Sequence, residues 1–293
     1  MKEVLILSGK GGTGKTSIVG SFAALAESKV LADCDVDAAD LHLLLKPVIQ
    51  QNHEFWSGQV AVIEEEKCTQ CGLCQEVCRF AAIDDFKVNP VSCEGCGFCF
   101  HICPADAIIM KENLAGHWFI SATDYGPLVH ARLGIAQENS GKLVALVRQE
   151  AKKIAKKQGF DYIISDGPPG IGCPVISSLS GVNLALLVTE PTLSGMHDLE
   201  RILGVCHHFG VPALVCINKY DLNEDNAYLI ERYCLNQNVT VAAKIPFDNI
   251  VTEAIVRGLP VVEYSQGKVT QGIEKLWQTV TTTFDVREVG CDN

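Results

Sequence analysis

Short apolar runs alternate with amphipathic stretches along most of the chain. Residues 4–8 read Val-Leu-Ile-Leu-Ser and lead through several glycines into a helix-like stretch over 17–27. Similar apolar runs occupy 162–165, 184–188 and 213–217, and helical patterns occupy 142–158 and 195–209. A short apolar run bounded by polar, Gly or Pro residues is typical of a buried parallel strand. Because such strands alternate here with helices, we expect an α/β fold with a doubly wound, mostly parallel sheet.

The alternation breaks between 60 and 111, where the chain repeats itself. The segment Cys68-Thr-Gln-Cys-Gly-Leu-Cys returns 25 residues later as Cys93-Glu-Gly-Cys-Gly-Phe-Cys. The tails that follow, Arg79-Phe-Ala-Ala-Ile and Pro104-Ala-Asp-Ala-Ile, also correspond. An internal repeat of this kind indicates a small two-fold module. We therefore expect an α+β domain over 60–111, inserted into a larger domain formed by 1–59 and 112–293.

Composition and charge narrow the classes of partner. The chain has 293 residues, 47% of them hydrophobic, and a formal net charge of −11. A field of that sign repels phosphate backbones, so we expect no nucleic-acid partner. We also expect no membrane anchor, because no apolar run reaches the roughly 18 residues that span a bilayer. The chain passes from Met1 directly into a strand-like segment without a secretory signal, which predicts a cytoplasmic protein.

Eight of the 14 cysteines fall between Cys68 and Cys103. The two halves share one spacing, Cys68-x2-Cys71-x2-Cys74-x3-Cys78 and Cys93-x2-Cys96-x2-Cys99-x3-Cys103. In a reducing compartment such cysteines are typically thiolate ligands rather than disulfides. Four thiolates also suit tetrahedral zinc, although structural zinc usually pairs two separated C-x2-4-C knuckles. Three closely spaced thiolates and a distant fourth favour [4Fe–4S] clusters, in which each iron takes one sulfur from the protein.

This stretch resembles the bacterial two-cluster ferredoxin over its full length. The crossed ligation of that family implies that one [4Fe–4S] cluster is held by Cys68, Cys71, Cys74 and Cys103. It implies that the other cluster is held by Cys93, Cys96, Cys99 and Cys78. Arg79 stands where that family usually has a proline, which alters the surroundings of one cluster but removes no ligand.

A glycine-rich loop separates the first apolar run from the first helical stretch. Gly9-Lys10-Gly11-Gly12-Thr13-Gly14-Lys15-Thr16 fits the phosphate-binding pattern G-x4-G-K-[ST]. Its glycines let backbone N–H groups surround phosphates at a helix N-terminus, where the helix dipole also favours anions. The pattern places Lys15 at the β- and γ-phosphates and the Thr16 hydroxyl on Mg²⁺. The residues expected to bind ATP in this loop are Gly9, Lys10, Gly11, Gly12, Thr13, Gly14, Lys15, Thr16 and Ser17.

With its first lysine, the loop resembles the deviant Walker A loop of the MinD/Mrp/ParA/nitrogenase-iron-protein ATPases. The resemblance implies that Lys10 crosses a dimer interface to the partner's nucleotide. It also implies a nucleotide-bound dimer, formed by two copies or with a related ATPase, whose opening and closing is coupled to hydrolysis.

Three further segments resemble the same family in order. Asp33-Cys34-Asp35-Val36-Asp37 corresponds to switch I, which implies that Asp35 polarises the attacking water or assists Mg²⁺. Asp166-Gly167-Pro168-Pro169-Gly170 corresponds to switch II, which places Asp166 at hydrated Mg²⁺. Asn218-Lys219-Tyr220-Asp221 corresponds to the segment that reads adenine, with Asn218 as the expected contact beside Lys219. The combination resembles a subgroup of MinD-type ATPases with an inserted ferredoxin domain.

Three functions fit these motifs. The first is an ATP-hydrolysing, dimer-gated iron–sulfur protein that couples turnover to electron transfer, and we rank it first because complete four-cysteine sites usually hold their clusters tightly. The second is an Mrp-like cluster carrier, although the C-terminal C-x-x-C of that group is absent. The third is a MinD-like positioning or redox-sensing ATPase. The expected client is a redox or iron–sulfur protein. Cys173 matches the offset of a cluster cysteine in the nitrogenase iron protein, but residues 104–172 supply no second one. We therefore expect a packed side chain, with a ligand at a dimer interface as the alternative.

Overall fold

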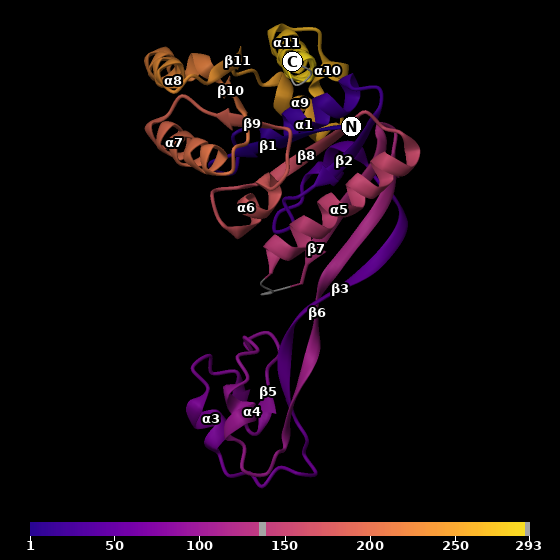
Figure 1. Cartoon of the computed structure of the whole chain (residues 1–293), viewed down its shortest axis with the longest axis vertical. Helices are drawn as coiled ribbons and strands as arrows, with labels where there is room; N and C mark the ends of the chain where they lie inside the picture. Colours follow the sequence, from indigo (N-terminus) through magenta and orange to yellow (C-terminus); the bar gives the residue numbers. More distant parts are fainter. Residues whose placement is uncertain (135–138, 291–293) are drawn as a thin grey trace. The chain divides into compact units, whose positions relative to one another are not determined.

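The computed structural model describes residues 1–134 and 139–290, and the chain forms two compact units (Figure 1). The first unit comprises Met1–Asn52, Phe119–Ala131 and Gly141–Asn293, and the second comprises His53–Trp118 and Arg132–Ser140. The second unit extends beyond the expected insert over 60–111. Two strands of 16 residues each, β3 (Val48–Ile63) and β6 (Ile108–Thr123), run through the expected boundaries.

The elements follow the expected alternation. The remaining strands are β1 (Lys2–Ser8), β2 (Lys29–Asp33), β4 (Ile83–Asp84), β5 (Lys87–Val88), β7 (Gly126–Leu133), β8 (Tyr162–Pro169), β9 (Leu184–Thr189), β10 (Ala213–Asn218) and β11 (Thr240–Ile245). The helices are α1 (Lys15–Leu25), α2 (Leu41–Leu45), α3 (Leu73–Val77), α4 (Phe98–Ile102), α5 (Ser140–Gln158), α6 (Cys173–Leu179), α7 (Leu193–His208), η1 (Tyr220–Leu222), α8 (Glu224–Asn236), α9 (Ile250–Val256), α10 (Val261–Tyr264) and α11 (Lys268–Gly290).

The large sheet has the strand order β11-β10-β9-β1-β8-β2-β7-β6-β3. Its neighbours from β11 to β7 are parallel. The mostly parallel α/β sheet expected from the apolar runs is therefore confirmed. β6 turns into β7 through two residues, and a connection that short joins antiparallel strands.

Helices cover both faces of the parallel sheet, because alternate side chains of each strand point to opposite faces. Val4 and Ile6 of β1 belong to a core cluster shared with α1, α2, α10 and α11. Leu5 and Leu7 belong to a second cluster shared with α6, α7 and α8. Since strands buried on both sides need apolar residues at every position, the continuous apolar runs of the sequence follow from this layering.

The carboxyl ends of β1, β2, β8, β9 and β10 meet at one edge of the sheet, as in any parallel arrangement. One boundary there differs from the expectation. The run over 162–165 was expected to end before Asp166, but β8 continues to Pro169, which lies opposite Ser8 of β1. A side chain at position 167 would collide with Leu5, Leu7 and the Ile6 carbonyl, so the glycine allows β8 to lie this close to β1.

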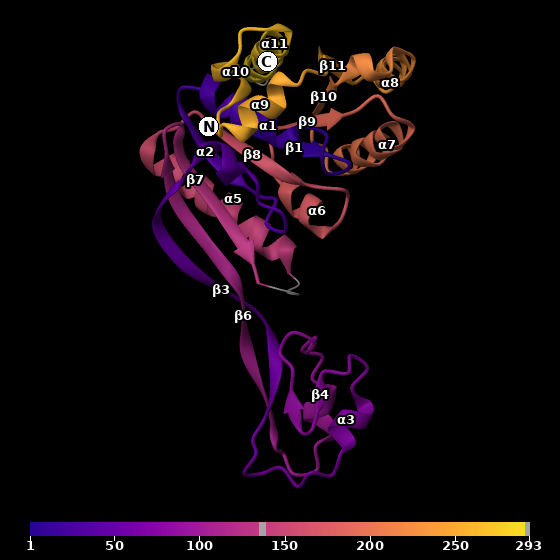
Figure 2. The same ribbon diagram turned by 180° about the vertical axis from the view of Figure 1, so that it is seen from behind.

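The second unit, which contains α3 and β4 (Figure 2), has a small core of its own, and its two halves repeat in structure. The helices α3 and α4 each follow a glycine with positive φ, Gly72 at 82° and Gly97 at 74°. Ile83 and Ile108, which occupy equivalent places in the two halves, are both buried. The two strands β4 and β5 form an antiparallel hairpin between the halves.

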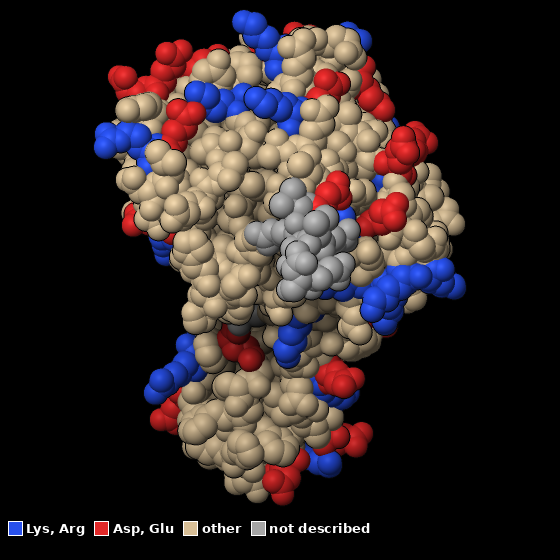
Figure 3. Space-filling model, turned by 45° about the horizontal axis from the view of Figure 1, so that its top comes forward, with Lys and Arg blue, Asp and Glu red and all other residues tan. Residues whose placement is uncertain are grey.

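The surface carries charge of both signs. On the face drawn in Figure 3, acidic side chains lie among the basic ones. Within the described part of the chain, no helix is long and apolar enough to cross a bilayer.

Candidate nucleotide site and cysteine cavities

The glycine-rich loop lies between β1 and α1, as the pattern predicts. A cavity of about 310 Å³, room for about ten water molecules, is lined by Gly11, Gly12, Thr13, Gly14, Lys15, Thr16 and Ser17 together with Ser8, Asp35, Ala38, Asp40, Pro169 and Ile255. Gly14 has a φ of 90°, and a Cβ on it would collide with the Asn218 amide. A glycine is therefore required where the loop turns into the helix. Gly9 and Lys10, also expected to bind ATP, do not line this cavity.

Lys15 is buried between the two carboxylates expected from the switch segments. Its Nζ lies 2.5 Å from Asp166 Oδ1 and 3.6 Å from Asp35 Oδ2. Burial lowers the pKa of Lys15, but the carboxylates of Asp166 and Asp35 raise it more, so the net shift is upward. The fold thus brings together three residues that lie far apart in the sequence.

Asp33 is a fourth member of this cluster, to which no sequence motif assigned a role. It ends β2 and is 1% exposed. Its Oδ1 accepts a hydrogen bond from Asp35 N at 3.1 Å, while its Oδ2 is buried without a hydrogen-bond partner. Burial and the nearby Asp166 raise the pKa of Asp33 well above its ordinary value. Burial likewise raises the pKa of Asp35 to about 6, against the opposing effect of Lys15.

A second cavity of about 220 Å³ continues from the loop toward the ends of β10 and β11. It shares Gly12, Gly14, Ser17 and Ile255 with the first cavity. Its other lining residues are Ile18, Asn218, Lys219, Ile245, Pro246, Phe247, Asp248, Val251, Thr252, Val261, Val269 and Ile273. An apolar cleft that adjoins a phosphate-binding loop suits a nucleotide base. No motif in the sequence placed Ile245–Asp248 at this cavity.

Asn218 lies in the wall of this cavity, with its polar atoms bonded to the protein. Its Nδ2 donates to the Thr13 carbonyl at 2.7 Å, and its Oδ1 accepts from Lys219 N at 3.1 Å. Lys219 Nζ donates to the Gly12 carbonyl at 2.9 Å. Both residues therefore brace the glycine-rich loop.

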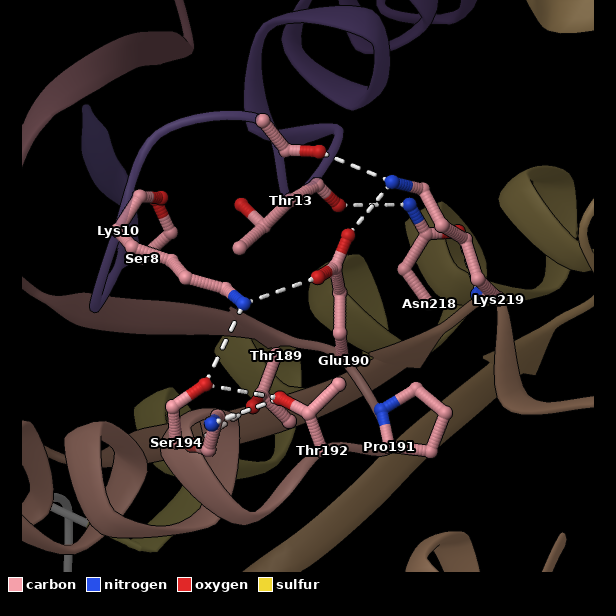
Figure 4. Close-up of polar contacts among 12 residues, drawn as sticks. Ser8, Lys10, Thr13, Thr189, Glu190, Pro191, Thr192, Ser194, Asn218 and Lys219 are labelled. Atoms are coloured by element: carbon pink, nitrogen blue, oxygen red, sulfur yellow. Dashed lines mark hydrogen bonds and ion pairs between the residues drawn. The ribbon is translucent and has the colours of Figure 1, made fainter. Parts of the chain in front are cut away.

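Glu190, just after β9, joins Lys219 to Lys10 (Figure 4). Its Oε1 lies 2.5 Å from Lys219 Nζ, and its Oε2 lies 3.4 Å from Lys10 Nζ. Lys10 also donates to the Ser194 hydroxyl at 3.5 Å. No sequence motif pointed to Glu190, because its position after a strand becomes informative only when the loops are brought together.

The eight cysteines of the second unit line two separate cavities. One is lined by Cys68, Cys71, Cys74 and Cys103. The other is lined by Cys78, Cys93, Cys96 and Cys99. Each cavity thus takes three cysteines from one half of the repeat and the last cysteine of the other half.

The last cysteine of each half has the same backbone partner. Ala82 N donates to Cys78 Sγ, and Ala107 N donates to Cys103 Sγ, both at 3.4 Å. Burial raises the pKa of Cys74, with a further contribution from Cys68 and Cys71.

Burial also raises the pKa of Cys99, and Cys93, Cys96 and Cys78 add to the shift.

As the side chains stand, no group of three or more His, Cys, Asp or Glu within residues 1–134 and 139–290 is arranged to hold a metal ion.

Four of the other described cysteines are buried. Cys206, Cys216 and Cys234 are buried, and burial raises the pKa of each thiol. Cys34 is also buried. Cys173 begins α6 and is exposed, so the expectation of a packed side chain was wrong.

Known proteins share this architecture. The chain matches the model of the CobQ/CobB/MinD/ParA nucleotide binding domain over residues 4–261. It is 35% identical over 279 residues to the uncharacterised protein MJ0578 of Methanocaldococcus jannaschii, covering 94% of this chain and 95% of that protein. It is 22% identical over 286 residues to the septum site-determining protein MinD of Thermotoga maritima, covering 93% of this chain and 85% of that protein.

Solved structures show the same fold. The cell division ATPase MinD of Pyrococcus furiosus has a TM-score of 0.57 at 22% identity, covering 96% of this chain and 99% of that one. The septum site-determining protein MinD of Pyrococcus horikoshii, complexed with Mg-ADP, also has a TM-score of 0.57, at 21% identity and 95% coverage of both chains.

Proposed function

Because the chain belongs to the CobQ/CobB/MinD/ParA nucleotide-binding family, we propose that it hydrolyses ATP with Mg²⁺ and couples turnover to electron transfer through two [4Fe–4S] clusters. The chain is a nucleotide-binding ATPase of the ParA/MinD type. The iron–sulfur half of the proposal rests on one observation, the two cavities lined by four cysteines each.

At the nucleotide end, the proposal assigns roles to residues that already touch one another. A triphosphate carries more negative charge than the carboxylates that now surround Lys15, so Lys15 exchanges Asp166 for the β- and γ-phosphates. The released carboxylates of Asp35 and Asp166, with the Thr16 hydroxyl, hold Mg²⁺ and its water. Catalysis of this kind consists of positioning and charge stabilisation.

Lys10 provides the coupling to a dimer. In the single chain its ammonium lies against Glu190 and Ser194, and its side chain is 38% exposed. Under the proposal, Lys10 leaves these partners and reaches the nucleotide of a second copy or of a related ATPase. Binding of ATP then favours a closed dimer, and hydrolysis opens it.

The cysteine cavities fit the proposed clusters in donor chemistry and number. Each cavity is lined by four thiols, the ligand set that a [4Fe–4S] cluster requires, and a backbone N–H already donates to one sulfur of each set. Such a cluster accepts or releases one electron when bound. The four cysteines of each cavity would hold it, and the apolar side chains of Ile83 and Ile108 would exclude water. The backbone N–H groups that donate to Cys78 and Cys103 would favour the thiolate form of these two residues.

One observation favours the carrier function as a second candidate. Cys71 and Cys96, the middle cysteine of each C-x2-C-x2-C run, are exposed. A ligand that reaches solvent is open to attack by the thiols of a client protein. The two functions differ in whether iron leaves the chain during turnover.

The test is anaerobic measurement of iron and sulfide per chain, before and after turnover of Mg-ATP, with an apo-ferredoxin acceptor present. Electron transfer predicts about eight irons retained throughout, and delivery predicts ATP-dependent loss to the acceptor. A preparation with no iron after reconstitution would contradict both.

Two double variants test which cysteines share a cluster. In Cys68→Ser/Cys103→Ser both changes fall in one cavity, so about four irons remain in the other. In Cys78→Ser/Cys103→Ser each cavity loses one ligand, so no complete site remains. Ligation within each half would instead empty both sites in the first variant. Cys173→Ser, outside both cavities, is the matched control and retains about eight irons.

A further inference from the structure

The base end of the nucleotide cavity has walls from two segments that leave neighbouring strands. β10 and β11 are parallel, and their register ends with Asn218 opposite Ile245. Beyond that point the chain continues as Lys219–Leu222 on one side and Pro246–Asp248 on the other, no longer paired as a sheet. Lys219 and Phe247 both line the cavity.

Asp221 joins these two segments. Its Oδ1 accepts a hydrogen bond from Phe247 N at 2.7 Å, across 26 residues of sequence. Lys219 has a φ of 56°, a left-handed conformation that turns the chain into the short helix containing Asp221. A second link, Lys244 Nζ over the Tyr220 ring at 5.5 Å, lies one residue before β11 ends. The Asp221 bond therefore ends on Phe247, which lines the cavity, whereas the cation–π contact joins Lys244 and Tyr220, which do not.

We infer that Asp221 is a positioning residue for base recognition, which holds the Pro246–Asp248 wall in its binding conformation through Phe247 N–H. The inference rests on the proposed function, because it assumes that this cavity receives the purine of ATP. If the wall is already ordered before binding, the ligand does not have to order it. The binding free energy then carries no cost for the conformational entropy of this segment.

The phosphate end has separate supports. Asn218 donates to the Thr13 carbonyl and Lys219 donates to the Gly12 carbonyl, and neither bond involves Asp221. Loss of the Asp221 carboxylate therefore loosens the wall at the base and leaves the glycine-rich loop braced. This separation distinguishes a positioning role from a general structural one.

The experiment compares the affinity of the full-length protein for ATP, GTP and inorganic tripolyphosphate, which lacks a base, by calorimetry. For Asp221→Ala we expect ATP to bind about tenfold more weakly, because the exposed hydrogen bond from Phe247 N to the charged Asp221 carboxylate is lost. We expect affinity for tripolyphosphate within about twofold of the original protein, and a smaller ratio between the affinities for ATP and GTP, because a loosened wall discriminates less. The KM for ATP rises while kcat at saturation stays unchanged, because the wall does not touch the phosphates.

Two variants act as controls. Asp221→Asn keeps an oxygen that accepts from Phe247 N–H, so it retains most of the affinity for ATP. Asp225→Ala removes an exposed carboxylate nearby, in the first turn of α8, and leaves all three affinities unchanged.

The inference is overturned if Asp221→Ala binds ATP normally, if tripolyphosphate weakens as much as ATP, or if Asp221→Asn behaves like Asp221→Ala. Failure of the unaltered protein to bind ATP at all would instead contradict the proposed function.

Discussion

Replacement of Lys15 by alanine removes the cation from a buried cluster that contains Asp33, Asp35 and Asp166. The Lys15 side chain is 7% exposed and lies 2.5 Å from Asp166 and 3.6 Å from Asp35. Breaking a buried ion pair by removing one partner typically costs about 3–5 kcal/mol, because the other charge stays buried without compensation. We therefore expect Lys15→Ala to lower the free energy of unfolding by about that amount at neutral pH and to abolish ATP turnover.

The loss of stability depends on pH with a definite sign. The pKa values of Asp33 and Asp35 already lie above their ordinary values, and loss of Lys15 raises them further. Between the ordinary and the raised pKa the folded chain binds more protons than the unfolded one, so stability falls as pH rises. The pKa of Asp35 is about 6 with Lys15 present and higher without it, so near pH 5 this carboxyl is largely protonated in the variant and the deficit is smaller than near pH 8.

The assay is urea unfolding without nucleotide or Mg²⁺ at about pH 5 and about pH 8. The matched control is Lys153→Ala. Lys153 lies 2.7 Å from Glu150 but is 60% exposed, so its loss changes stability by less than about 1 kcal/mol at either pH. The reasoning is refuted if Lys15→Ala is no less stable than Lys153→Ala, or if its deficit is the same at both pH values.

Three other outcomes follow from single contacts. Since burial raises the pKa of Asp35 to about 6, protonation of this one carboxyl should lower kcat/KM for ATP below about pH 6. A pH profile that stays flat down to about pH 5 would contradict a role for ionised Asp35. Arg148→Met should lower the free energy of unfolding by about 3 kcal/mol, because Glu3, 1% exposed, loses two hydrogen bonds from Arg148 of 2.7 and 2.8 Å and keeps only Lys152, at 3.0 Å, as a cation among the described residues. Glu3→Leu/Arg148→Met should recover part of the loss. Glu190→Gln should remove the ion pair to Lys10 and lower the ATP concentration at which a dimer is detected by sedimentation. An unchanged ATP concentration would show that this ion pair does not restrain Lys10.

Features that depend on local sequence were predictable. The place of the glycine-rich loop between the first strand and the first helix was predictable, because the glycines and the apolar run before them are local features of the sequence. The apolar runs over 162–165, 184–188 and 213–217 likewise each lie within a buried strand.

The strands β3 and β6 were missed, because most of the β3 side chains are exposed and the apolar signal is weak. β8 was ended too early at 165, because pairing with β1 overrides the low strand propensity of Gly167 and the prolines.

The sequence by itself determined the local chemistry: a phosphate-binding loop, acidic residues after two strands, and eight cysteines in two equal spacings. Tertiary structure alone decided which of these residues meet. Lys15 meets Asp166 across 151 residues, and Asp221 meets Phe247 across 26. Glu190 gains its role only because the ends of β1, β9 and β10 lie side by side. The physical reason is that a polar residue in a loop carries no periodic pattern, so its partner is set by the packing of the sheet that brings the loops together.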